Sequence, residues 1–304
     1  MSGAVINPCW RLDAAPGRQG EGGRRCQLDP ADAGPPPLLS VVTVVLDGGD
    51  LMARTMDSVL GWPRDRVEYI VVDGGSRDNT LAQIKAREDQ LEYWLSEPDT
   101  GISDGFNKGI SLCRGQVVGL INCGDWYEPE ALAEVERWYR SDDPAGVLCG
   151  LLQFRRGGVR ATVTDVRPEL LDSNMSVAHP ACFVRRDLYL RYGGFNHDYR
   201  LAMDYELLLR LFVAGVRFRR CPRVLANMEH GGVSEQRWCQ GLWETHRARQ
   251  DHIPDSPWAR SRHVRWLILR KQFRFFLERF GLHGLVRLYR EYLAPVRRTG
   301  SDAQ

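Results

Sequence analysis

The chain has 304 residues, enough to bury a full hydrophobic core in one large or two modest domains. Apolar residues make up 43% and charged residues 26%, an ordinary balance for a soluble globular protein. No apolar run reaches the ~18 residues of a membrane span and the N-terminus lacks a signal-peptide core, so we expect a cytoplasmic protein. The eight cysteines are scattered without a C-x-x-C pair, which argues against a zinc site and a disulfide framework.

Positive charge is concentrated near the C-terminus. Between residues 257 and 299, ten Arg and one Lys stand against two Glu, a net charge of +9, whereas the whole chain carries +2. The rest of the chain is therefore acidic. A basic tail on an acidic body predicts an anionic partner surface, either a membrane or a nucleic acid.

Residues 1–37 are rich in Gly, Pro, Arg and Asp, lack apolar periodicity and end in consecutive prolines. Such a composition buries too little apolar surface to offset the entropy lost on ordering. We therefore predict a disordered N-terminal extension over 1–37 that carries no chemistry. The folded part of the chain is expected to begin at Leu38.

Three short apolar runs after residue 37 predict buried strands, at 38–46, 69–72 and 117–121. Each run ends in a glycine-containing turn with an acidic residue, which is Asp47, Asp73 or Asp125. This pattern is typical of α/β folds, in which the carboxyl ends of parallel strands open one ligand crevice. A carboxylate there can hold a hard divalent cation, which makes Asp125 a metal-ligand candidate. The alternative is that Asp125 caps the helix that follows.

Motifs in the middle of the chain carry a resemblance to a known enzyme family. They include Asp73-Gly74-Gly75-Ser76, the segment 96–110 and the stretch 122–126. In order and spacing, residues 38–234 resemble the family 2 glycosyltransferases. The resemblance implies the GT-A fold, an α/β nucleotide-diphospho-sugar transferase fold with a mixed, mostly parallel central sheet flanked by helices. We expect this domain to span 38–235, and a basic, amphipathic helical C-terminal region to span 236–304.

The resemblance implies a nucleotide-sugar site at the strand ends. Val44 and Leu46 are expected to help form the base pocket, and Asp73 to bind the base. The residues expected to lie along the nucleotide are Asp99, Asp104 and Asn107.

The resemblance also implies a divalent metal, Mn²⁺ or Mg²⁺, with Asp125 as the coordinating aspartate. The family usually has two adjacent aspartates there, whereas this chain has Gly124 in the first place, so donor affinity, donor identity and metal dependence are open. His230 lies in a loop that resembles the family's donor-covering loop, and it is a further candidate for a metal or diphosphate contact. The alternative is that His230 is neither, as is usual for a lone loop histidine.

The acceptor side is implied by a second group of residues. Asp204 matches the aspartate that opens the acceptor-side helix and acts as general base on the acceptor hydroxyl. A helix-capping role is the alternative, because acidic residues are favoured in a first turn. Glu206 is the reserve candidate, and it is otherwise expected to pair with Arg210 at i+4. His179 is expected to shape the acceptor pocket rather than to bind metal.

The basic tail contains an apolar stripe at helical spacing, formed by Trp266, Leu269, Phe273, Phe276 and Phe280. Such a stripe usually packs on its own domain, but aromatics on a cationic helix are also typical of an interfacial membrane helix. The sequence therefore leaves two alternatives, a core-packed helix or peripheral contact of 257–299 with the inner face of the plasma membrane. Nucleic-acid binding is not expected, because no recognised motif accompanies the charge.

These observations together indicate an inverting, metal-assisted glycosyltransferase. It would move a single sugar from a nucleotide-sugar donor to a carbohydrate or lipid-linked acceptor, in cell-surface polysaccharide or glycolipid biosynthesis. The rival is a catalytically silent GT-A-fold protein, in which Gly124 marks decay of the site and the basic tail docks a partner or membrane. The presence of Asp73, Asp125 and Asp204 together favours the enzyme.

Overall fold

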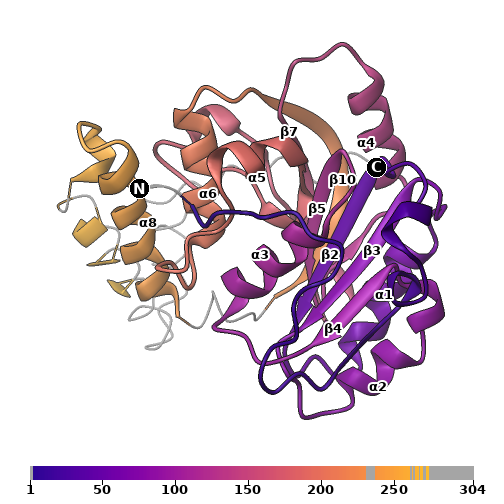
Figure 1. The fold of residues 1–304 in the computed structure, drawn as a ribbon. Coiled ribbons are helices and arrows are strands. Elements are labelled where there is room, and N and C mark those ends of the chain that lie inside the picture. Colours follow the sequence, from indigo (N-terminus) through magenta and orange to yellow (C-terminus); the bar gives the residue numbers. More distant parts are fainter. Residues whose placement is uncertain are drawn as a thin grey trace.

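The computed structural model describes residues 3–230, 237–260, 262, 264–266, 268–269 and 272–273. A central sheet with helices on both faces dominates the molecule (Figure 1). Its strand order is β1-β4-β3-β2-β5-β9-β7-β10-β6, with β8 paired to β7. The strands are β1 (Gly20–Gly22), β2 (Leu39–Val45), β3 (Val67–Asp73), β4 (Tyr93–Ser96), β5 (Val117–Asn122), β6 (Trp126–Tyr127), β7 (Val147–Arg156), β8 (Val159–Val163), β9 (Cys182–Arg185) and β10 (Phe218–Glu229).

The centre of the sheet is parallel. Strands β4, β3, β2 and β5 are adjacent and parallel, and β7 and β10 form a second parallel pair. Between these groups, β9 is antiparallel to both neighbours, and the short edge strands β1 and β6 are antiparallel as well. The three predicted strands are confirmed as β2, β3 and β5, and the predicted mixed sheet with its mostly parallel centre is confirmed too.

Each face of the sheet has its own hydrophobic core, because successive side chains of a strand point to opposite faces. Val42 and Val44 pack with Phe106 on one face, whereas Val41 and Val45 pack on the other. The first face is covered by α3 (Ile102–Leu112), α5 (Arg186–Tyr192) and α6 (Met203–Val213). The second is covered by α1 (Leu51–Leu60), α2 (Thr80–Lys85) and α4 (Ala131–Arg140). Burial on both faces explains why β2 and β3 read as continuous apolar runs.

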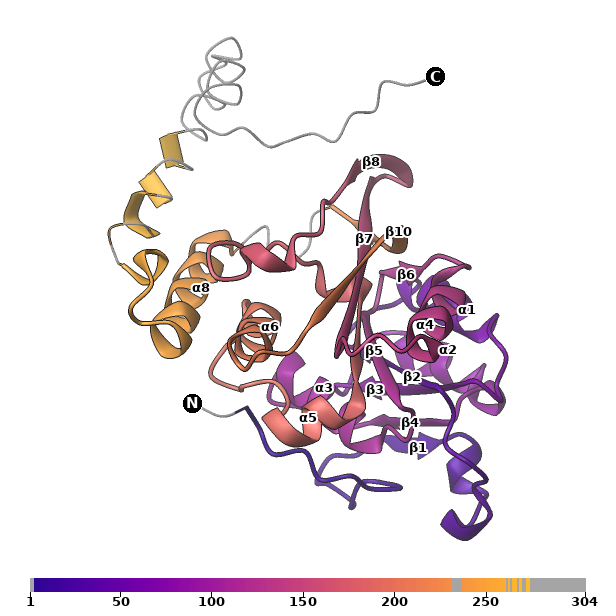
Figure 2. The ribbon, with the colours of Figure 1, turned by 90° about the horizontal axis from the view of Figure 1, so that it is seen from above.

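The N-terminal extension is ordered from residue 3 onward, so the prediction of disorder over 1–37 was wrong. Its strand β1 adds to the sheet beside β4, and Figure 2 shows the segment running past α5 towards these two strands. Fully buried Arg25 donates 2.6 Å hydrogen bonds to Glu68 and to the Leu112 carbonyl oxygen. These partners are distant in sequence, so composition alone gave no sign of them.

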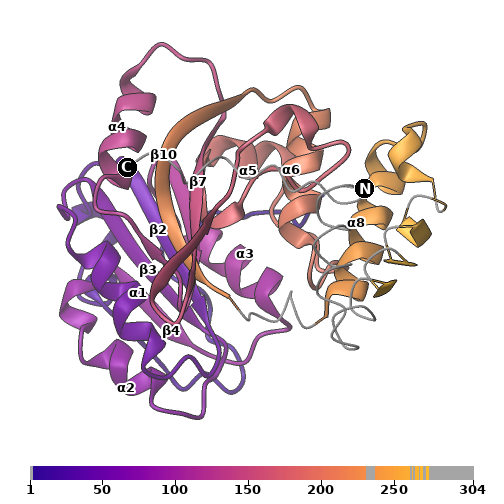
Figure 3. The same ribbon diagram turned by 180° about the vertical axis from the view of Figure 1, so that it is seen from behind.

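The first helix of the predicted C-terminal region belongs to the body of the molecule. Helix α8 (Trp238–His252) packs beside α6 (Figure 3). Arg249 of α8 donates a 2.8 Å hydrogen bond to the Tyr205 hydroxyl of α6. Further along, Trp266, Leu269 and Phe273 are 51%, 64% and 52% exposed. Phe276 and Phe280 lie outside the described residues, and within the described part no helix is long and apolar enough to cross a membrane.

Candidate functional site

The carboxyl ends of the parallel strands meet in one row. Val45 lies beside Asp73, Asp73 beside Ser96, and Val44 beside Asn122. Because β4, β3, β2 and β5 are adjacent and parallel, the loops that follow them share one edge of the sheet. The predicted crevice residues therefore gather at this edge.

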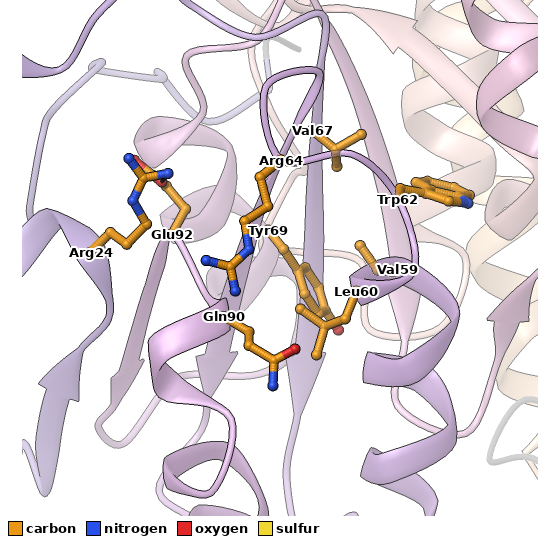
Figure 4. A pocket seen from close by; sticks show the side chains of 9 residues that line it. All are labelled: Arg24, Val59, Leu60, Trp62, Arg64, Val67, Tyr69, Gln90 and Glu92. Carbon is orange, nitrogen blue, oxygen red and sulfur yellow. Dashed lines mark ion pairs between the residues drawn. The ribbon is translucent and has the colours of Figure 1, made fainter.

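A small cavity lies at the other ends of these strands (Figure 4). Val67, where β3 begins, and Trp62, just after α1, contribute to its lining. Its volume is about 20 Å³, which is room for little more than a water molecule. This cavity is therefore not a nucleotide site.

Asp73 organises the turn after β3. Its carboxylate is fully buried and accepts hydrogen bonds from the Ser76 backbone N–H, the Ser76 hydroxyl and the Ser96 hydroxyl. Asp73 thereby fixes the turn after β3. Its predicted contact with the nucleotide base stays a prediction.

Asp99 and Val44, which are both predicted for the donor pocket, lie near each other beside Gly105. A Cβ atom on Gly74 would lie 2.6 Å from Asp99 Oδ2, so a larger residue at 74 would push this carboxylate aside. A Cβ atom on Gly105 of α3 would lie 3.1 Å from Val44 Cγ1 and 3.4 Å from Asp99 Oδ2. Burial raises the pKa of Asp99. Leu46 lies past the end of β2 and is 61% exposed, so it is available to a ligand but is not part of this cluster.

The two predicted nucleotide residues on α3 face different ways. Asp104 accepts a 3.0 Å hydrogen bond from the Thr100 N–H, so it shapes the loop that carries Asp99. Asn107 is buried and its side chain bonds both the N–H and the carbonyl oxygen of Phe195, at 2.8 and 2.9 Å. Its amide also lies 3.1 Å from His197 Nε2. Asn107 thus connects α3 to the segment before α6, and its predicted place along the nucleotide stays a prediction.

Asp125 follows β5 and is 6% exposed. Burial raises the pKa of its carboxyl to about 7, and the opposing hydrogen bond from Asn122 is long, at 3.5 Å. Asn122 Oδ1 is buried and has no hydrogen-bond partner among the residues that the structure describes. A buried carboxylate and an unpaired amide oxygen on neighbouring side chains are hard oxygen donors, so their chemistry fits a divalent cation.

The backbone conformation explains why glycine, and not the aspartate usual in the family, stands at position 124. Gly124 has φ +97°, a conformation that residues with a Cβ atom rarely adopt. Arg54 of α1 donates a 2.8 Å hydrogen bond to the Gly124 carbonyl oxygen, and its guanidinium lies 3.7 Å from the Trp126 ring centroid. Sequence reasoning missed Arg54, since a polar residue on an amphipathic helix carries no signal of its own. An aspartate at 124 would be strained in this turn.

His230 directly follows β10. Its ring stacks on Phe154 with centroids 4.7 Å apart. Residues 231–236, which continue the predicted donor-covering loop, lie outside the described residues. Within the described part of the chain, no cluster of three or more His, Cys, Asp and Glu side chains forms a ready metal site.

Asp204 lies in the first turn of α6 and is partly exposed. Burial raises the pKa of its carboxyl to about 6, although its hydrogen bond from the Tyr205 N–H, at 2.8 Å, opposes the shift. Glu244 of α8 accepts the backbone N–H groups of Arg200, Leu201 and Ala202, at 3.0, 2.7 and 2.9 Å. Glu244 thus fixes the loop that presents Asp204, and sequence reasoning missed it because the contact joins distant segments.

Glu206 has a structural environment. It is fully buried and pairs with Arg210 at 3.0 Å and with His252 at 2.8 Å. Burial would raise the pKa of Glu206, but the hydrogen bonds from His252 and Arg210 outweigh it and the pKa is lowered. The expected i+4 pair with Arg210 is confirmed. Glu206 is corrected as an acceptor-side candidate, because both its oxygens are engaged away from solvent.

His179 lies buried between aromatic rings. Its ring makes edge contacts with Phe106 and Phe195, with centroids 5.5 and 5.8 Å apart. Burial lowers the pKa of His179 to about 4, so the imidazole is neutral at physiological pH. Its Nε2 has no partner within the described residues, which leaves one polar atom for a ligand or water.

A cavity of about 360 Å³ opens between the start of α3 and the loop before α6. Its lining includes Gly101 and Ser103 on the α3 side, and Arg200 and Leu201 on the α6 side. Arg237, just before α8, also lines it. The cavity thus connects the loop of Asp99 with the loop of Asp204.

Relatives of this chain were found by sequence. A family model described as glycosyl transferase family 2 matches residues 40–193. An uncharacterized glycosyltransferase of Mycobacterium tuberculosis is 31% identical over 207 residues, which cover 66% of this chain and 78% of the relative. A PGL/p-HBAD biosynthesis glycosyltransferase of Mycobacterium bovis is 27% identical over 209 residues, which cover 65% of this chain and 79% of the relative.

A solved structure agrees in fold. The mannosyltransferase PcManGT from Pyrobaculum calidifontis, in complex with GDP-Man and Mn²⁺, matches with a TM-score of 0.56 at 18% identity. The match covers 73% of this chain and 65% of that one, so this chain spans about two thirds of that protein's length. The likeness supports the GT-A fold. Because the family model spans just over half of the chain and includes Asp73, Asp99 and Asp125, this protein belongs to the family 2 glycosyltransferases.

Proposed function

We propose that the protein is an inverting glycosyltransferase that moves one sugar from a nucleotide-sugar to a hydroxyl of a carbohydrate or lipid-linked acceptor. The observation that carries the proposal is the state of Asp204. Its carboxylate is partly exposed, and its pKa is raised to about 6 by burial. A general base is most effective when its pKa lies near the operating pH. Asp204 would take the proton of the acceptor hydroxyl as that oxygen attacks the anomeric carbon, and a single displacement inverts the configuration there.

The donor is proposed to bind at the strand ends. Half-buried Asp99 would offer a carboxylate to a nucleoside, the edge of buried Val44 would offer an apolar surface, and exposed Leu46 would cover the nucleoside. Asp104 holds the loop that carries Asp99, because its carboxylate accepts a hydrogen bond from the Thr100 N–H. The neighbour PcManGT is described in complex with GDP-Man, which supports a nucleotide-sugar donor here.

The proposed cofactor is a divalent cation, Mn²⁺ or Mg²⁺. The Asp125 carboxylate and the Asn122 amide oxygen would hold it, with other positions left to the diphosphate and water. When bound, such a cation neutralises the charge that develops on a diphosphate leaving group. Arg54 lies against the same turn and adds fixed positive charge. His230 is retained as a proposed diphosphate contact, because it lies three residues after Asn227, which pairs with Trp126 beside Asp125.

The acceptor is proposed to enter the cavity between α3 and the loop before α6. Leu201 lines this cavity and lies three residues before Asp204, so the two Cα atoms are at most ~11 Å apart. Arg200 and Arg237 give the lining a positive charge, which favours an acceptor with an anionic group, such as a phosphate-linked lipid. The unpaired Nε2 of buried His179 would hydrogen-bond an acceptor hydroxyl.

A role in glycolipid or surface-polysaccharide synthesis is proposed from the relatives. The Mycobacterium bovis protein is named for PGL/p-HBAD biosynthesis. We place the reaction at the cytoplasmic face of the plasma membrane, with the basic region 257–299 in peripheral contact. The exposure of Trp266, Leu269 and Phe273 supports this placement.

The rival function is a catalytically silent nucleotide-sugar binding protein. The observation that favours it is Gly124, which stands in place of an aspartate that the family usually carries. Both functions require donor binding, so binding alone does not separate them. Catalysis that depends on Asp204 separates the two functions.

The deciding experiment compares wild type with Asp204→Asn. Nucleotide-sugars are screened with Mn²⁺ for a rise in melting temperature, and release of nucleoside diphosphate from the best donor is then measured. Asn keeps the size and the first-turn position but cannot accept the proton, so turnover should fall by about 10²–10⁴ with the donor Kd unchanged. Asp198→Asn, at an exposed position on the same loop, is the matched control and should turn over like wild type. Wild-type turnover by Asp204→Asn would reject this base, and no turnover by the wild type with any donor would favour the silent protein.

A further inference from the structure

The N-terminal segment 12–21 lies against the loops that carry the donor side of the site. The Gln19 N–H donates a 2.7 Å hydrogen bond to the Ser96 carbonyl oxygen, which continues the pairing of β1 with β4. A Cβ atom on Gly17 would lie 3.2 Å from the Pro98 ring, and one on Gly75 would lie 3.5 Å from Gln19 Nε2. The segment therefore contacts both the turn after β3 and the loop after β4.

Arg18 anchors this segment. Its Nε and Nη2 donate to Glu97 Oε2 at 2.8 and 2.7 Å. Its Nη1 and Nη2 also donate to the carbonyl oxygens of Leu12 and Asp13, at 3.2 and 2.7 Å. The Arg18 side chain is 12% exposed and that of Glu97 is 2% exposed, so salt in the solvent screens this pair weakly.

Glu97 connects Arg18 to the donor loop. Its Oε1 pairs with Lys108 Nζ at 2.8 Å, and its backbone N–H donates to the Asp73 carbonyl oxygen at 3.0 Å. Lys108 also pairs with Asp104 at 3.4 Å, and Asp104 accepts the Thr100 N–H. These contacts hold both ends of the loop 97–101, which carries Asp99.

We propose that the N-terminal segment is part of the donor site, with Arg18 as a positioning residue that holds the loop 97–101 so that Asp99 meets the nucleotide. This inference rests on the proposed donor site. The family model begins at residue 40, so the role is assigned to residues that the family match does not include. A segment without apolar periodicity thereby acts in substrate binding.

Loss of the Arg18 charge removes one of the two cations that pair with Glu97. Among the described residues, only Lys108 then still pairs with the buried Glu97 carboxylate, and Lys108 also pairs with Asp104. The loop 97–101 loses the ion pair that ties it to the N-terminal segment and has more conformations to lose when the nucleotide binds. Donor affinity should fall for that reason, whereas Asp204 and the chemical step are untouched.

The test measures the Kd of UDP and of GDP with Mn²⁺ by isothermal titration calorimetry, on the full-length wild type and on Arg18→Gln. The Kd should rise roughly tenfold or more in Arg18→Gln. Hydrogen exchange of the 97–101 amides should become faster, and kcat at saturating donor should match wild type. Arg18→Lys keeps the charge but not the forked contacts, so its Kd should lie between the two.

Arg24→Gln is the matched control. Arg24 lies on the same extension, is about half exposed, and its nearest carboxylate, Glu92, is 3.9 Å away and outside the donor loop. Its Kd for nucleotide should equal that of wild type. An Arg18→Gln variant with a lower melting temperature but an unchanged Kd would overturn the inference and leave Arg18 a purely structural role.

Two further outcomes are decisive. If Arg18→Gln does not fold, Arg18→Lys decides, and a wild-type Kd in Arg18→Lys overturns the inference. If the wild type binds neither UDP nor GDP, the proposed donor site fails and this inference falls with it. If the wild type binds nucleotide and Arg18→Gln binds it equally well, the proposed donor site stands and only the role of Arg18 is rejected.

Discussion

Two carboxylates on α6 show how strongly position decides the role of a residue. Asp204 and Glu206 are two residues apart, yet burial raises the pKa of Asp204 to about 6, whereas hydrogen bonds from His252 and Arg210 outweigh burial and lower the pKa of Glu206. A carboxylate with few partners is poised to exchange a proton, and one that accepts hydrogen bonds from an arginine and a histidine is held ionised. The first suits catalysis and the second suits the connection of α6 to α8.

The Asp204 pKa predicts the pH dependence of turnover. The base acts only when it is deprotonated, so kcat should be constant well above pH 6 and should fall about tenfold for each pH unit below it. A pH profile of kcat between pH 4.5 and 8.5, at saturating donor and Mn²⁺, measures this fall of kcat at low pH. The residual activity of Asp204→Asn should not show the fall. A wild-type profile that is flat across pH 6 would assign the proton transfer to another group.

At the scale of elements, α6 is held from both sides. Asn107 of α3 binds the backbone of Phe195, and Glu244 of α8 accepts the N–H groups of residues 200–202. These contacts place the first turn of α6 between the donor-side helix and a C-terminal helix. The orientation of Asp204 therefore depends on helices that lie far apart in the chain.

Glu244→Ala should separate positioning from binding. Loss of the carboxylate leaves the N–H groups of Arg200, Leu201 and Ala202 without their acceptor, so the loop before Asp204 loosens. We expect kcat to fall roughly ten- to hundredfold, with the nucleotide Kd unchanged. Steady-state kinetics together with titration calorimetry check both quantities.

Arg247→Ala provides the control for this helix. Arg247 lies on α8 with Glu244, is more exposed, and pairs with exposed Asp198 at 3.4 Å. Its kcat should stay within about twofold of wild type, since surface ion pairs contribute little. An equal fall of kcat in both variants would mean that α8 acts only through global stability.

At the scale of the whole molecule, the N-terminal segment and helix α8, which flank the region that the family model matches, both pack against it. The N-terminal segment completes the sheet beside β4 and contacts the donor loops. Helix α8 completes the acceptor side through Glu244 and Arg249. The matched region 40–193 therefore contains most of the donor side but not Asp204 or the elements that position it.

The basic tail leads to a prediction about membranes. Replacement of Trp266, Leu269 and Phe273 together by Ser should abolish sedimentation with vesicles of anionic phospholipid and leave the melting temperature unchanged, because these side chains are at least half exposed. Leu190→Ser, at a 43% exposed position on α5, is the control and should sediment like wild type. A large fall in melting temperature of the triple variant would instead place the stripe in a core.

The sequence by itself predicted the βαβ order, the strands β2, β3 and β5, and the places of Asp125 after a strand and of Asp204 at the start of a helix. These features depend on local signals, namely apolar runs, glycine turns and motif spacing, which a single chain segment carries. Sequence did not reveal that Asp73 and Asn107 are occupied by neighbouring hydrogen-bonding groups, since burial depends on what packs around a residue.

Only the tertiary structure showed where the N-terminal segment and helix α8 pack. Arg18 and Glu97 are far apart in sequence, as are Glu244 and Ala202, and neither pair has a periodic or spacing signal. The order of the N-terminal extension was missed for the same reason, because Arg25 finds its partners Glu68 and Glu92 only when the sheet has formed. Polar contacts between distant segments are set by the packing of the whole chain, which local composition does not encode.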